Sequence, residues 1–149
     1  PSRGRVSHAL ALDPVHPTRV KMCVVKDDAA DALPAATRYE VLETKVREGE
    51  RRYAQVACDL ETGRQHQIRV HMASLGTPLV GEKLYGHDDT LFARGVDGQL
   101  TEDDLAALEL PRHALHAHRL ELPHPKDPGR SVVVVSPLPT DLQTFWDAV

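Results

Sequence analysis

The stretch from residue 60 to residue 86 constrains the fold of this 149-residue chain more than any other segment. It reads L-E-T-G-R-Q-H-Q-I-R-V-H-M-A-S-L-G-T-P-L-V-G-E-K-L-Y-G. Thr62 and Gln65 have the spacing of a capping box, in which a hydroxyl and a side-chain amide satisfy free backbone amides at a helix start. Gly76 follows the last apolar position and favours a helix end there. The spacing therefore predicts a helix over residues 63–75.

Arg64 has two possible positions in such a helix. At about 100° per residue it falls on the same side as the apolar Ile68 and Leu75, whereas His66 and Arg69 point the other way. An inward guanidinium stays charged, so it requires a carboxylate partner, whose pKa it would lower. The alternative is that Arg64 lies at the helix mouth and bonds a carbonyl or water. Spacing alone leaves both positions open.

The rest of the chain indicates an α+β fold, with an antiparallel or mixed β-sheet flanked by helices. Alternating apolar residues and turn signals predict strands over residues 6–12, 19–25, 39–46, 53–60, 113–122 and 131–135. Arg47-Glu48-Gly49-Glu50 separates the third and fourth strands, which predicts a hairpin, and residues 123–129 form another turn. Short helices are expected over residues 101–108 and after Thr140 or Asp141, while residues 26–35 and 87–98 are expected to be irregular. A length of 149 residues suits a single domain.

Composition excludes several classes of protein. The formal charge of −4 argues against indiscriminate nucleic-acid binding, although residues 62–71 are a candidate basic patch. Cys23 and Cys58 are isolated, which makes a disulfide framework or zinc ribbon improbable and fits a reducing compartment. No stretch has the length of a membrane span, and no apolar signal region begins the chain. We expect a cytoplasmic protein without membrane contact.

The nine histidines do not predict a metal site. His66 and His71 are five residues apart, not the four that place two ligands on one helical face. His116 and His118 are expected on one strand face, but no third ligand stands at a standard spacing. P-loop, dinucleotide-binding and nucleophile-elbow motifs do not occur in the sequence. The sequence therefore predicts no metal and no cofactor.

The stretch from residue 60 to residue 86 resembles the third sequence motif of the RluA-type RNA pseudouridine synthases, with T-G-R-x-H-Q-I-R-V-H as a specific signature. Four further strings follow in the family's order: G-R-V at 4–6, H-P-T-R-V-K-M at 16–22, P-A-A-T-R-Y-E-V-L-E at 34–43 and R-H-A-L-H-A-H-R-L-E-L-P-H-P at 112–125. Glu82 stands where the family usually has an aspartate. The family's segment with the nucleophilic aspartate, and the tyrosine of the next segment, are absent; both belong upstream of Pro1.

This resemblance implies the C-terminal portion of a pseudouridine synthase-like catalytic domain. Family members isomerise uridine to pseudouridine in rRNA or tRNA with an aspartate nucleophile and no metal or organic cofactor, after extruding the nucleotide from its stack. By the same resemblance, Arg64 pairs with that aspartate and Ile68 packs against the nucleotide. RNA contacts are expected from the remaining polar residues of the motif, with Arg69 on a phosphate: His66, Gln67, Arg69 and His71.

Three hypotheses follow for the function. In the first, a segment outside this sequence supplies the aspartate, and the 149 residues alone are inactive. In the second, the chain is a noncatalytic RNA-binding relic of the same fold. In the third, it is an unrelated metal or acid-base enzyme.

Overall fold

The computed structural model describes residues 2–47, 49 and 51–149, and the chain forms two compact units, one ending at His113 and one starting at Ala114. All strand pairs in the described residues are antiparallel, and helices accompany them. The predicted α+β class is confirmed. The expected single domain stays a prediction, and each unit is described by itself.

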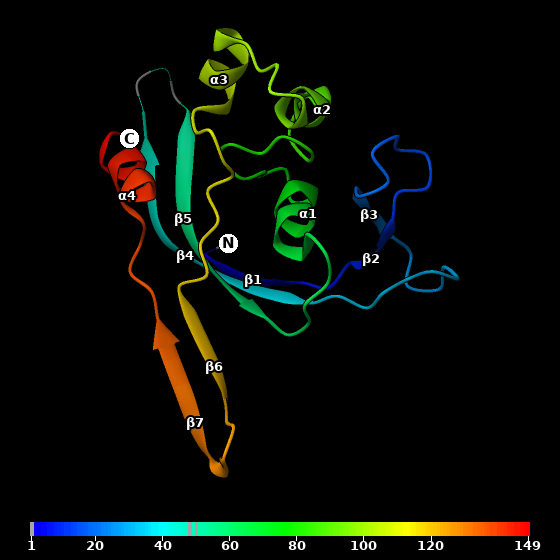
Figure 1. Cartoon of the computed structure of the whole chain (residues 1–149), viewed down its shortest axis with the longest axis vertical. Helices are drawn as coiled ribbons and strands as arrows, with labels where there is room; N and C mark the ends of the chain where they lie inside the picture. Colours follow the sequence, from blue (N-terminus) through cyan, green and yellow to red (C-terminus); the bar gives the residue numbers. More distant parts are fainter. Residues whose placement is uncertain (1, 48, 50) are drawn as a thin grey trace. The chain divides into compact units, whose positions relative to one another are not determined.

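The first unit contains a three-stranded sheet, a two-stranded sheet and three helices (Figure 1). The three-stranded sheet has the order β1-β4-β5, and β2 pairs with β3. The elements are β1 (Arg3–Val6), β2 (Ala9–Leu12), β3 (Met22–Val25), β4 (Thr37–Val46), β5 (Arg52–Leu60), α1 (Gln67–Ser74), α2 (Thr90–Val96) and α3 (Glu102–Leu108).

Helix α1 lies between the two sheets of the first unit, in contact with β3 and β4 (Figure 1). A small apolar core joins it to the β2–β3 pair through Leu10, Met22, Ala35 and Val70, and Tyr85 packs against this core. Burial of such side chains stabilises a fold by about 1.5–3 kcal/mol each. The core therefore fixes α1 and the segments at its two ends.

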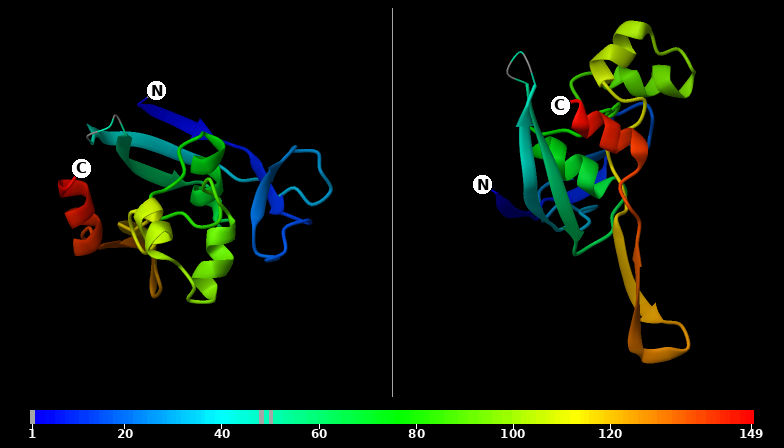
Figure 2. Two further views of the ribbon diagram at one scale, coloured as in Figure 1. Left: turned by 90° about the horizontal axis from the view of Figure 1, so that it is seen from above. Right: turned by 90° about the vertical axis from the view of Figure 1, so that its left-hand side faces the viewer.

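The second unit consists of a hairpin followed by a helix, and the right view of Figure 2 shows its two strands side by side. The strands are β6 (Arg119–His124) and β7 (Asp127–Val135), and the helix is α4 (Thr140–Asp147). His116 and His118 precede β6, and a ring nitrogen of each donates to the Ser136 carbonyl, at 3.1 Å and 2.8 Å. Both histidines are thus bonded within this hairpin.

Several predicted elements are confirmed. The hairpin of residues 39–46 and 53–60 is β4–β5, although Glu48 and Glu50 of its expected turn lie outside the described residues. Gly76, with φ of 76°, ends α1 as predicted, and its amide donates to Ala73 at 2.9 Å. Thr101 caps α3 in a capping box with Asp104.

Other predictions are wrong in their bounds. The strand expected over 6–12 is two strands, with β1 and β2 in different sheets. Helix α2 lies within residues 87–98, which were expected to be irregular. Arg94 of this helix bonds Asp88 inside the segment and Asp104 outside it. Residues 113–118 are not strand, and β7 begins inside the expected turn. Pro139, not Thr140 or Asp141, occupies the N-cap of α4.

Across the described residues, no helix has the length and apolar character needed to cross a membrane.

Candidate active site

The loop before α1 is shaped by the side chain of Gln67. Its amide oxygen accepts from the Thr62 hydroxyl at 2.7 Å and from the Arg64 amide at 3.0 Å. Its nitrogen donates to the Ala36 carbonyl at 3.0 Å and the Thr37 hydroxyl at 2.9 Å. These bonds hold residues 62–66 as a turn and start the helix at Gln67. The predicted capping box of Thr62 and Gln65, and a helix start near residue 63, are therefore wrong.

His71 continues the same hydrogen-bond chain on the next turn of α1. Its ring is fully buried, and Nε2 lies 3.0 Å from the His8 carbonyl, which can only accept. Burial lowers the pKa of His71, so the ring is neutral and Nδ1 accepts from the Thr37 hydroxyl at 2.9 Å. Each donor thus has one acceptor. The series of hydrogen bonds is continuous from Ala36 to His8, and it passes through Thr62, Gln67, Thr37 and His71.

Arg64 is exposed, and it is not part of α1. Its Nε donates to the Pro34 carbonyl at 3.0 Å. The expectation of an inward Arg64 on an apolar helical stripe is wrong because the helix begins three residues later and His66 takes a left-handed conformation, φ 54°, at its N-cap. Of the two positions left open by spacing, the structure shows the helix mouth with a bonded carbonyl.

The buried cation of this region is Arg69. It is 9% exposed and forms two hydrogen bonds with Glu82, Nε to Oε2 at 2.8 Å and Nη2 to Oε1 at 2.6 Å. The prediction that Arg69 turns away from the core is wrong: its partner is thirteen residues later in the chain, beyond the reach of a helical wheel. Paired geometry of this kind is what a buried guanidinium requires.

Backbone contacts hold Glu82 in place. Its Oε1 also accepts from the Leu84 amide at 2.9 Å and the Tyr85 amide at 3.3 Å. Burial raises the pKa of Glu82, but hydrogen bonds from Arg69 and from the Leu84 amide lower it more, so the net pKa lies below its usual value. Gly81 precedes it with φ of 74°, and a Cβ there would collide with the Arg112 carbonyl. The pair is therefore ionised and fixed.

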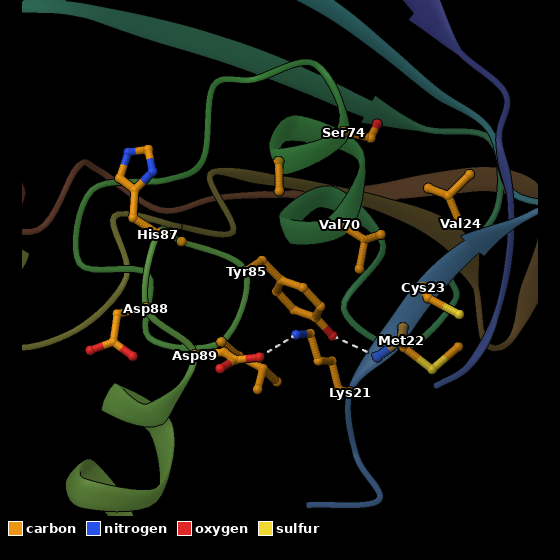
Figure 3. A pocket seen from close by; sticks show the side chains of 13 residues that line it. Lys21, Met22, Cys23, Val24, Val70, Ser74, Tyr85, His87, Asp88 and Asp89 are labelled. Carbon is orange, nitrogen blue, oxygen red and sulfur yellow. Dashed lines mark hydrogen bonds and ion pairs between the residues drawn. The ribbon is translucent and has the colours of Figure 1, made fainter. Parts of the chain in front are cut away.

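Tyr85 links this ion pair to the loop before α1. The Arg69 guanidinium carbon lies 5.0 Å from the centre of the Tyr85 ring. The Tyr85 hydroxyl accepts from the Met22 amide at 2.9 Å (Figure 3). The same hydroxyl lies 2.8 Å from His66 Nδ1. Burial, and then the charge of Arg69, lowers the pKa of His66 and of His113. Arg69 thus stands among two neutral histidines and an aromatic face.

One edge of Arg69 remains available. Among the described residues, none accepts a hydrogen bond from Nη1. No buried side-chain donor there lacks a partner, so Nη1 must reach solvent. An anion placed at this edge would meet a cation that is already oriented by Glu82 and Tyr85. Such preorganised charge is worth more than a mobile charge in water.

The predicted site residues differ in accessibility. Ile68 and His66 are half-buried, Arg64 is exposed, and Gln67, Arg69 and His71 are buried. Gln67 and His71 have their polar atoms bonded within the protein, so in this conformation they position α1 and offer little to a ligand. Sequence reasoning missed Tyr85 and Thr37; their partners are distant in the chain, and no local spacing indicates them.

An open pocket of about 450 Å³ lies between β3, α1 and residues 84–89, and Tyr85 is part of its wall (Figure 3). Neither Arg64 nor Ile68 lines it. Lys21 and Asp89, which border it, are bonded to each other at 2.7 Å. In the described part of the chain, no three metal-binding side chains gather, and both cysteines are free.

Comparison with known proteins gives the family of these residues. Residues 3–74 match the family model described as RNA pseudouridylate synthase. The "Ribosomal large subunit pseudouridine synthase D" of Nitrosomonas europaea is 40% identical over 98% of this chain, and that of Xanthomonas campestris is 41% identical over 90%. The chain spans 36% and 37% of the length of these two relatives.

Solved structures agree with the sequence relatives. "Human RNA Pseudouridylate Synthase Domain Containing 1" superimposes with a TM-score of 0.67 at 29% identity, over 92% of this chain and 49% of that protein. "Human RNA Pseudouridylate Synthase Domain Containing 4" gives a TM-score of 0.65 at 25% identity, over 99% and 56%.

Proposed function

The chain belongs to the RNA pseudouridine synthase family, in its RluA-type branch, and on this premise we propose that it forms the part of a catalytic domain that holds the target uridine of an RNA. In the reaction, the bond between uracil N1 and ribose C1′ breaks and a bond between C5 and C1′ forms. N1 gains a proton and C5 loses one. The nucleotide must first leave its stack for a protein group to reach it.

The observation that carries this proposal is the Arg69–Glu82 pair, whose two residues both lie in the stretch 60–86 that resembles the family's third motif. We assign to Arg69 the role that the resemblance gave to Arg64, namely to hold the nucleophilic aspartate ionised. A fixed positive charge within reach lowers a carboxylate's pKa. Nη1 of Arg69 is the atom available for that aspartate. Ile68, next to it on α1, would pack against the nucleotide.

The other motif residues take supporting roles in this proposal. His66 is half-buried beside Tyr85 and would contact the RNA. Gln67 and His71 would position α1 through their hydrogen-bond chain. The relatives named for the large ribosomal subunit support rRNA over tRNA as the proposed substrate. We propose a cytoplasmic location for the reaction.

The nucleophilic aspartate is proposed to come from a segment outside residues 1–149. The test uses RNA labelled with tritium at uridine C5. The 149 residues alone should release no tritium, and the same residues joined to the gene's upstream segment with the aspartate should release it. Tritium release by the 149 residues alone would overturn the proposal that the aspartate comes from another segment. Binding of RNA without release by the longer protein would instead support a noncatalytic RNA-binding role.

A further inference from the structure

Two arginines that have no carboxylate partner among the described residues flank one contact of the first unit. The side-chain nitrogen of Gln65 donates to the Val20 carbonyl at 3.0 Å, and this bond joins the loop before α1 to the segment that enters β3. Arg64 precedes Gln65 and Arg19 precedes Val20 in the sequence. Residues 45 positions apart are thereby brought to the two sides of a single hydrogen bond.

Asp13 and Glu61, the acidic residues closest in sequence to Arg19 and Arg64, are already bonded, and so is Asp89. Glu61 pairs with Arg5 and Arg38. Asp89 pairs with Lys21, and Asp13 accepts from two backbone amides. Within the described residues, neither Arg19 nor Arg64 has an ion-pair partner. Their charge is therefore not cancelled locally, although the whole chain is acidic.

Arg64 is oriented for an external ligand. Its Nε is bonded to the Pro34 carbonyl, so the stem is held, while neither terminal nitrogen has an acceptor among the described residues. A planar guanidinium fork of this kind matches the oxygens of a phosphate. Holding the fork in advance reduces the conformational freedom that is lost on binding.

Backbone strain gathers at the same corner. Only three non-glycine residues in the described chain have a positive φ, and two of them are Arg19, at 51°, and His66, at 54°. Such a conformation costs roughly 1–2 kcal/mol for a residue other than glycine. Strained residues cluster at ligand-binding sites, where surrounding structure over-determines them.

We infer that Arg19 and Arg64 form a binding site for the RNA backbone phosphates beside the target uridine. The inference rests on the proposed function and deepens it. The loop that carries Arg64 leads directly into α1, and His66 of this loop contacts Tyr85, which covers Arg69. An RNA strand held by Arg19 and Arg64 would present its next nucleotide to Arg69. An enzyme that extrudes a nucleotide needs to hold the RNA backbone in this way.

The salt dependence of binding tests this site. A short fluorescein-labelled oligouridylate is titrated with the 149-residue chain, and the anisotropy titration is repeated over a series of KCl concentrations. Each lost phosphate contact lowers the slope of log K against log salt by about 0.7 on a single strand. We expect that decrease for Arg19→Gln and for Arg64→Gln, and about twice that decrease for the double variant. Arg52→Gln, at an exposed arginine of β5, is the matched control and should keep the wild-type slope.

A conservative variant separates charge from fold. Arg64→Lys should keep the wild-type salt slope but bind more weakly, because an ammonium cannot form the two-pronged contact. An unchanged slope in the double variant, or an equal decrease in Arg52→Gln, would overturn the site. If the aspartate-bearing protein releases tritium while the slope of the double variant is unchanged, the phosphate site at Arg19 and Arg64 is refuted and the proposed isomerase activity is supported. If the slope decreases but the aspartate-bearing protein releases no tritium, the proposed isomerase activity is refuted and the phosphate site is supported.

Discussion

Arg69 and Glu82 face each other across two parallel hydrogen bonds of 2.8 Å and 2.6 Å, and Glu82 is the less exposed of the two, with 1% of its side chain accessible. A buried pair adds little net stability, because both ions have lost their hydration. Its significance is geometric. Glu82 is fixed by backbone amides, so it holds the guanidinium in one orientation and leaves one edge for another anion.

Removal of the Glu82 charge should strongly destabilise the chain. Glu82→Gln leaves the Arg69 cation buried without an anion, and breaking a buried pair in this way costs about 3–5 kcal/mol. Urea unfolding measures the change. Glu121→Gln is the control, because its partner Arg119 is equally close at 2.7 Å but both side chains are exposed. Equal losses in the two variants would contradict a special role for burial at Glu82.

The neutral state of His71 predicts a loss of stability in mild acid. Its pKa in the folded chain is lowered by burial, below the usual 6.5. The unfolded chain therefore binds the proton more readily, so this contribution is present above pH 6.5 and is lost as pH falls below it. One such group changes the free energy of unfolding by at most about 1.4 kcal/mol per pH unit.

The measurement for His71 is the free energy of unfolding between pH 7 and pH 5, by urea titration at each pH. His71→Gln should flatten the slope below the usual histidine pKa of 6.5. His118→Gln, at an exposed histidine of the second unit, should leave the slope as in the wild type. A wild-type slope in His71→Gln would show that this ring does not remain neutral on folding.

The side chain of Gln67 should matter more than that of its neighbour Gln65. Gln67→Leu removes four hydrogen bonds, two of them buried, and one intramolecular hydrogen bond contributes about 0.5–1.5 kcal/mol to stability. We therefore expect a loss of at least about 2 kcal/mol in urea unfolding. Gln65→Leu removes one exposed bond and should cost about 1 kcal/mol or less. If Gln65→Leu destabilised the protein more than Gln67→Leu, the hydrogen bonds of Gln67 would not be what shapes the loop before α1.

The strain at Arg19 predicts an unusual response to glycine. Arg19→Gly removes a left-handed penalty of roughly 1–2 kcal/mol, and the added freedom of the unfolded chain takes back about 0.4–1 kcal/mol. Stability should thus stay near the wild type or rise slightly. Arg19→Val, which is β-branched, should be clearly destabilising. If glycine lowers the thermal midpoint as much as valine, φ at this position is not the cause.

Local chemistry explains which features were predictable from the sequence. Gly76 ends α1 because a left-handed glycine acts within one turn of its own helix. Thr101 and Asp104 form a capping box over three residues for the same reason. The β4–β5 hairpin follows from alternation and a short turn. Each of these signals lies entirely inside the segment that it determines.

The site was less predictable because its contacts join distant parts of the chain. The helix begins at Gln67 because that side chain bonds Ala36 and Thr37, 31 and 30 residues earlier. Arg69 is buried because Glu82 is present, and the helical wheel contains no information on Glu82. The family motif indicated the segment, while the roles that we propose within it required the paired side chains.

The most direct test compares Arg69→Met with Arg64→Met in the aspartate-bearing protein, with tritium release from C5-labelled RNA as the measure. We predict that Arg69→Met lowers kcat by more than about a hundredfold, as expected for loss of a preorganised charge. Arg69→Lys should recover part of that rate, and far-UV circular dichroism checks that each variant is folded. Arg64→Met should mainly raise KM. Near-normal turnover in Arg69→Met, with turnover abolished in Arg64→Met, would contradict the central claim that Arg69 is the cation of the active site.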